Sequence, residues 1–160
     1  MSINNLSDLM LAIEAYMNTY PGLSYVNTFQ IRKYNINSLP NFETYCIIIS
    51  PASRREKNIA LRTKIKTLTI DVVCIVRNFD PLLSLVGQAT GETGIIKLIE
   101  DTEKALLDFG SANKNELTIL YNEMDEAVNF NQHKFPERDD FYHEVILPYR
   151  VKLKPKTVEV

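Results

Sequence analysis

The residues between Leu68 and Val76 constrain the fold of this chain more than any other segment, because every second residue is apolar. A strict period of two is typical of a β-strand that buries one face. Residues 42–50 contain an unbroken apolar run, which predicts a second strand that is central in its sheet and covered on both faces. The segment between them, residues 51–67, is rich in Arg and Lys and alternates in its second half. We interpret it as a long β-hairpin whose tip projects from the body.

The parity of the apolar positions changes along this hairpin. Ile59, Leu61 and Ile65 occupy odd positions, whereas the strand from Leu68 onward keeps its apolar residues at even positions. A change of phase by one residue moves side chains to the other face of a sheet. We therefore predict a β-bulge or a bend near Thr67, where the hairpin meets the main sheet.

Two amphipathic helices are predicted from apolar residues at spacings of three and four. The first covers residues 6–20, with Asn5 as its N-terminal cap and Pro21-Gly22 at its end. The second covers residues 94–109 and is predicted to stop at Gly110. Between the two helices, Asp80-Pro81 predicts a short helical turn capped by the aspartate.

Three further segments have strand patterns: residues 23–34, the short segment 117–121, and the closing segment from Val145 to Leu153. Pro148 lies in the closing segment. Because proline cannot donate a backbone hydrogen bond, it indicates that this strand lies at an edge of the sheet.

The order of these elements predicts the fold class. Strands follow one another in the chain and the helices are segregated from them, which is typical of α+β proteins. We expect a single domain over residues 1–160, built from a mainly antiparallel sheet with a long projecting β-hairpin and two main helices packed on one face. Residues 155–160 are expected to form a flexible tail.

No motif in the chain indicates catalysis or a bound cofactor. His133, in a polar connection, and His143 lie among acidic residues, but their spacing matches no compact metal-ligand pattern. Cys46 and Cys74 fall in predicted strands, where a thiol usually packs as a small hydrophobe; a disulfide or a reactive pair is the alternative. The sequence contains neither a glycine-rich phosphate loop nor a glycine-flanked serine. We therefore expect a protein that is not an enzyme, with no metal, cofactor or small-molecule substrate.

The targeting features of the sequence favour the cytoplasm. The first residues contain no basic segment followed by an apolar run, so we expect no secretory signal. The longest mostly apolar stretch, Leu68 to Val76, is too short to cross a bilayer. We expect no membrane partner.

Charge is distributed unevenly, although the formal net charge is only -2. Residues 51–77 contain seven basic and two acidic residues, a net charge of +5, and residues 100–144 contain four basic and twelve acidic residues, a net charge of -8. Three explanations remain open: solvated surface faces, a basic ribbon that binds nucleic-acid phosphates, and head-to-tail self-association of opposed patches. No aromatic residue lies between Tyr45 and Phe79, so the hairpin offers no rings for base stacking.

We predict an interface, with another subunit or with a tube, that uses these two zones. An isolated hairpin cannot bury its apolar residues, which favours a partner surface. Exposed ion pairs contribute at most about 1 kcal/mol each, so the charges would set register while apolar residues supply affinity. The hairpin side of the predicted interface comprises Arg54, Arg55, Lys57, Ile59, Leu61, Arg62, Lys64 and Lys66. Its acidic counterpart comprises Glu100, Asp101, Glu103, Glu123, Asp125 and Glu126.

Five features follow one another in the chain: the opening helix, the basic hairpin leading into Leu68 to Arg77, the Asp80-Pro81 break, the helix from Thr93 to Phe109, and the strand Val145-Ile-Leu-Pro-Tyr-Arg-Val-Lys-Leu153. In this order they resemble the tail terminator, or tail completion, proteins of long-tailed bacteriophages. The resemblance extends over roughly residues 6–154. It rests on element order and size, since the family has no catalytic or ligand motif, and no functional residue is carried over individually.

The resemblance implies a structural virion protein. Members of the family form hexameric rings on the head-proximal end of the tail tube, where they stop tube polymerisation and present a surface to the neck. For this chain it implies a homo-oligomeric ring in the tail or neck of a virion, with the tail tube protein and a neck or head-completion protein as partners. The alternatives are another head-tail connector, a tail-tube subunit, or a nucleic-acid-binding module that uses the basic hairpin.

Overall fold

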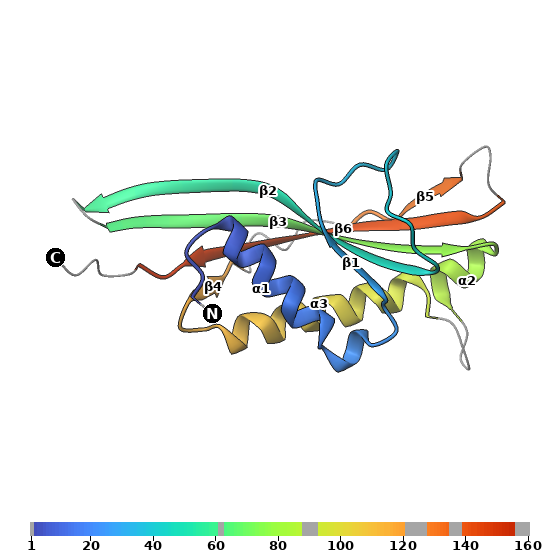
Figure 1. The fold of residues 1–160 in the computed structure, drawn as a ribbon, viewed down its shortest axis with the longest axis horizontal. Coiled ribbons are helices and arrows are strands. Elements are labelled where there is room, and N and C mark those ends of the chain that lie inside the picture. Colours follow the sequence, from blue (N-terminus) through green and yellow to red (C-terminus); the bar gives the residue numbers. More distant parts are fainter. Residues whose placement is uncertain (1, 61–62, 88–92, 121–127, 135–138, 156–160) are drawn as a thin grey trace.

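The fold is organised around one mainly antiparallel sheet of six strands (Figure 1). The computed structural model describes residues 2–60, 63–87, 93–120, 128–134 and 139–155. The strands lie in the order β1-β2-β3-β6-β4, with β5 also paired to β6, and β1 with β2 is the one parallel pair among the described residues. The strands are β1 (Thr28–Ile31), β2 (Tyr45–Ala60), β3 (Thr63–Asn78), β4 (Leu117–Ile119), β5 (Asn131–Lys134) and β6 (Phe141–Leu153).

Two helices, α1 (Leu6–Asn18) and α3 (Ile95–Ala112), pack on one face of this sheet, which we call the helix side (Figure 1). The even-numbered residues of β3 from Leu68 to Val76 are fully buried in the main core beneath them. The predicted period-two strand and the predicted α+β fold are therefore confirmed. None of the helices in the described ranges combines the length and the apolar composition needed to cross a bilayer.

The opposite face of the sheet, which we call the far side, is covered over only part of its area. Phe42, Cys46, Ile48 and Tyr142 form a second, smaller apolar cluster there with two β3 residues, Val73 and Ile75. Tyr34 and Leu39, from the connection between β1 and β2, pack against it. The start of β2 is thus buried on both faces, as its unbroken apolar run predicts.

Beyond this body, β2 and β3 continue as a two-stranded arm, at the left of Figure 1. We define the arm as residues 52–60 and 63–67. Residues 52–60 are all exposed, so the predicted projecting hairpin is confirmed. Its strands are longer than residues 51–67, because each continues without a break into the main sheet. Leu61 and Arg62 lie outside the described residues.

An irregularity is present where the arm meets the main sheet, as predicted, but it lies on β2 opposite Thr69 and Ile70 and not on β3 at Thr67. β3 pairs with β6 in an unbroken register from Thr67 to Asn78, and the pairing irregularities lie on β2, between Pro51 and Ser53 and between Asn58 and Ala60. The odd parity of Ile65 therefore needs no distortion of β3, because an odd residue simply faces the far side. The extra residue at the first of these irregularities is Ala52 of β2.

Several element boundaries differ from the predicted ones. The first helix ends at Asn18, and Pro21–Leu23 form a separate 3-10 turn, so the following strand β1 is much shorter than residues 23–34. The short helix α2 (Pro81–Val86) begins as predicted, with Leu82 N donating to Asp80 Oδ1 at 2.8 Å. The predicted polar connection at His133 is wrong, because Asn131–Lys134 form the strand β5.

Pro148 does not place β6 at the edge of the sheet, because β6 pairs with β3 on one side and with β4 and β5 on the other. β5 pairs with residues 141–144 of β6 and β4 with residues 151–153. Pro148 lies between these two stretches, where β6 has a strand neighbour on the β3 side alone among the described residues. The proline is tolerated at this local interruption.

Gly110 does not stop α3, which begins after Gly94 and continues to Ala112. Gly110 is buried where the helix crosses β4 and β6. A Cβ at this position would lie 2.1 Å from Ile119 Cδ1 and 3.3 Å from the hydroxyl of Tyr149, which itself donates to Leu106 O at 3.1 Å. The glycine therefore permits close packing of helix on sheet.

Gly110→Ala is expected to destabilise the protein by about 1–3 kcal/mol, because the added methyl overpacks the contact with Ile119. In an exposed helix interior the same change would stabilise by about 1 kcal/mol. Urea unfolding of Gly110→Ala, alone and combined with Ile119→Val, measures the effect. The double variant, which lacks the clashing Cδ1, should recover part of the loss; equal losses in both would contradict the packing explanation.

Candidate functional site

The arm carries its basic residues on both of its faces, because paired residues on neighbouring antiparallel strands point the same way. Arg54 pairs with Leu68, whose side chain lies in the main core, so Arg54 is on the helix side. Arg55 pairs with Thr67 and Lys57 with Ile65, so both are on the far side. The predicted basic surface is thus divided into two. Ile59, at the second irregularity of β2, is 53% exposed.

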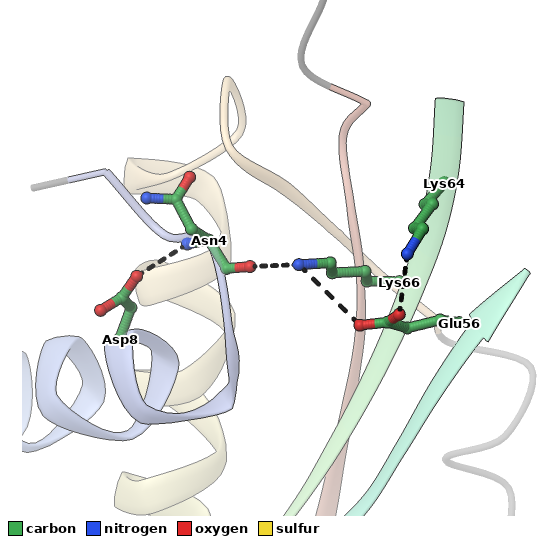
Figure 2. A network of polar contacts seen from close by, with 5 residues as sticks. All are labelled: Asn4, Asp8, Glu56, Lys64 and Lys66. Carbon is green, nitrogen blue, oxygen red and sulfur yellow. Dashed lines mark hydrogen bonds and ion pairs between the residues drawn. The ribbon is translucent and has the colours of Figure 1, made fainter. Parts of the chain in front are cut away.

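On the helix side, an ion-pair network joins the arm to the start of α1 (Figure 2). Lys64 Nζ and Lys66 Nζ form ion pairs with the Glu56 carboxylate, at 3.8 and 3.9 Å from its oxygens. Lys66 also donates to Asn4 O at 3.1 Å, and Asn4 N donates to Asp8 Oδ2 at 3.0 Å. Lys66 therefore links the arm to the segment before α1, whereas Lys64, whose side chain is 58% exposed, is paired with Glu56 inside the arm.

On the far side, the basic residues of the arm continue onto β6. The register aligns Arg55 with Thr67 and Lys152, and Ser53 with Thr69 and Arg150. Arg150 Nε donates to Thr69 Oγ1 at 3.0 Å. Sequence reasoning did not include Arg150 and Lys152 in the site; their alternation with buried residues in β6 was the available signal.

Three of the predicted acidic counterparts are among the described residues, and all three lie on α3. Glu100 and Glu103 are exposed, whereas Asp101 is paired with other residues of the same chain. Lys97 Nζ lies 2.7 Å from Asp101 Oδ1, and the Tyr25 hydroxyl donates to Asp101 Oδ2 at 2.7 Å. Burial and this hydrogen bond to a carboxylate raise the pKa of Tyr25. Glu123, Asp125 and Glu126 lie outside the described residues.

A polar cleft that sequence reasoning missed lies at the end of the sheet opposite the arm. It has a volume of about 500 Å³, and an adjoining cleft of about 330 Å³ shares Glu43, Thr44 and Arg77 with it. The strands β1 and β2 begin here and β3 ends here. The larger cleft is lined by Tyr25, Asn27, Thr28, Asn41, Phe42, Glu43, Thr44, Tyr45 and Arg77.

The two charged residues in the cleft differ in how they are paired. Arg77 forms an ion pair with Asp140, whose side chain is 2% exposed, and donates to Phe42 O at 3.1 Å. Its guanidinium also lies over the ring of Tyr142. Glu43 is exposed and forms no ion pair within the described ranges. Among the described residues, the carboxylate of Glu43 in the cleft is therefore not neutralised by an ion pair.

A buried group of polar side chains connects α2, β5 and β6. Ser84 hydrogen-bonds to His143 Nδ1, and the two residues are 0% and 5% exposed. Burial, with the neighbouring His133, lowers the pKa of His143. A substrate cannot reach a fully buried hydroxyl. We therefore assign this serine and histidine a structural role, in which their hydrogen bond stabilises the packing of α2 on β6. The described residues contain no group of three metal-binding side chains.

Cys46 and Cys74 are buried free thiols on neighbouring strands. They lie on opposite faces of the sheet, since Cys46 is in the far-side cluster and Cys74 is in the main core. This placement prevents the disulfide that the sequence left open. Burial raises the pKa of each thiol to about 12, so neither is a nucleophile at neutral pH.

Comparison with known protein families and with curated proteins finds no match to this chain. The geometry of the arm and the cleft is therefore the basis for its functional interpretation.

Glu144→Gln is expected to stabilise the protein by about 1 kcal/mol at pH 7. Glu144 is 5% exposed, its Oε2 has no hydrogen-bond partner, and His133 Nε2 is 3.5 Å away, too far for a good hydrogen bond. Burial raises the pKa of Glu144, so the folded state binds a proton more tightly than the unfolded state and loses stability as pH rises through that range.

Urea unfolding of the wild type and of Glu144→Gln between pH 4.5 and pH 7.5 tests this. The advantage of the variant should shrink as the pH falls, because protonation neutralises the wild-type carboxyl. Glu100→Gln, at an exposed site of α3, serves as the comparison. An advantage of Glu144→Gln that grows on acidification would contradict the assignment.

Proposed function

We propose that this chain is a structural subunit that assembles into a ring, in the manner of a phage tail terminator that caps the head-proximal end of the tail tube and joins it to the neck. It acts through surfaces rather than through catalysis. Another head-tail connector or a tail-tube subunit would use the same surfaces at a different position in the particle.

The observation that carries the proposal is the arm. Residues 52–60 are all exposed, and Ile59 is 53% exposed on a two-stranded ribbon that has no core of its own. A ribbon of this kind is marginally stable by itself, and exposed apolar residues on it favour a partner surface. The hydrogen bond from Lys66 to Asn4 O holds the arm against the body, which reduces the entropy lost on docking.

The arm also supports a nucleic-acid-binding module as a second candidate. Arg55, Lys57, Arg150 and Lys152 share the far side of the sheet, and phosphate groups would find several cations there. Filter binding of duplex DNA at 50 and 200 mM salt separates the two functions. A phosphate-binding face loses affinity steeply over this range, whereas a ring subunit shows no useful affinity at either concentration.

Ile59→Gln is expected to weaken ring assembly about tenfold or more, because burying one large apolar side chain in a neighbour contributes about 1.5–3 kcal/mol. Light scattering over a concentration series, with negative-stain imaging of the particles, measures the effect. At concentrations where the wild type is monomeric, the melting temperature should not change, because Ile59 is exposed in the single chain.

Leu11→Gln is the matched control, because Leu11 is 52% exposed on α1, away from the arm. It should assemble like the wild type. A wild-type protein that stays monomeric at high concentration and does not bind isolated tail tubes would overturn the proposed function.

A further inference from the structure

The arm and the cleft lie at opposite ends of one strand. β2 begins at Tyr45, in the wall of the cleft, and ends at Ala60, in the arm. At about 3.3 Å per residue the strand spans about 50 Å. The arm of one copy therefore cannot reach its own cleft, and any contact between them joins two molecules.

The cleft has the chemistry that receives a basic side chain. Glu43 supplies an exposed carboxylate, and the charge of Arg77 is already matched by Asp140. The rings of Tyr25 and Tyr45, with centroids 5.1 Å apart, form part of the wall, and aromatic faces attract guanidinium and ammonium groups.

The far side of the arm has the complementary chemistry. Arg55 and Lys57 are exposed there, and the other residues that the register places on this side of the arm are Ser53, Ala60, Thr63, Ile65 and Thr67. No carboxylate lies among them, because Glu56 faces the helix side. Apolar groups are available on both partners: Ile59 on the arm is 53% exposed, and Phe79, beside Glu43 in the adjoining cleft, is 72% exposed.

We propose that the arm of one copy docks by its far side in the cleft of a second copy, with Arg55 and Lys57 facing Glu43 and Ile59 near Phe79. The contact is head-to-tail, so each copy uses its arm on one neighbour and its cleft on another, which closes a ring when the rotation allows. This inference rests on the proposed function and names the surface that receives the arm. It assigns that role to the cleft, in place of Glu100 and Glu103 on α3.

A charge exchange tests the pairing. Glu43→Lys alone and Arg55→Glu with Lys57→Glu should each raise the dissociation constant for assembly about tenfold or more, because like charges then face each other. Combining all three substitutions restores opposite charges and should recover most of the affinity. Lys104→Glu and the pair Glu100→Lys with Glu103→Lys, all at exposed positions of α3, change charge by similar amounts elsewhere and should leave assembly unchanged.

Cross-linking locates the contact independently. A protein with Glu43→Cys and Lys57→Cys, treated with a short bismaleimide, should give a ladder of covalent multimers on a denaturing gel. An equal mixture of the two single variants should stop at dimers, because each copy then carries one reactive end. The native Cys46 and Cys74 are buried and protonated, so they do not react.

The outcomes separate the inference from the function on which it rests. Monomers in light scattering at every concentration overturn both. Wild-type rings that are insensitive to Glu43→Lys, or that cross-link through Lys57→Cys with Glu103→Cys instead, overturn the docking site and leave the proposed function standing. Recovery by the charge exchange, with a ladder from the double cysteine variant, supports the docking site.

Discussion

The pairing of β2 with β3 is the constraint on which the rest of the structure depends. These two strands pair from Tyr45 with Val76 at one end to Ala60 with Thr63 at the other. Within the body, both faces of the pair are buried, so packing fixes the register strongly. That register then extends into the arm, where no core exists to fix it. Packing in the body therefore determines the direction of the arm and the face on which each of its side chains lies.

Ala52 shows how a small local feature changes the chemistry of the surface. If Ala52 were paired in regular alternation and not bulged, the even and odd positions of β2 would keep one phase from body to arm, and Arg54 would share the far side with Cys46 and Ile48. With the bulge, Arg55 and Lys57 face the far side while Glu56 meets Lys64 and Lys66 on the helix side. The bulge thus places Arg55 and Lys57 on the face opposite Lys66, which anchors the arm through Asn4 O.

The elements with strong periodicity were predictable from the sequence, because burial imposes the pattern that reveals them. Leu68 to Val76 and the apolar stripes of α1 and α3 belong to this group. Features that depend on contacts between distant segments were not predictable. The sequence around Gly110 looks the same whether the glycine ends a helix or lets Ile119 pack closely against it. The polar strand β5 forms because it pairs with β6, which its own sequence does not reveal. The arm was found from its charges, but the cleft was missed because Tyr25, Glu43 and Arg77 are brought together by three different strand ends.

The length of β2 has a consequence for anything built from this chain. A hydrogen-bonded pair of strands is stiff along its axis, so the distance between the arm and the far end of the sheet is set by backbone geometry rather than by flexible side chains. Inserting two residues in each strand would lengthen that distance by about 7 Å and keep every side chain on its face, whereas inserting one would exchange the faces. Insertions of two residues in each strand would therefore change the spacing of such subunits and preserve the faces, whereas a single inserted residue would need a bulge like the one at Ala52 to restore them.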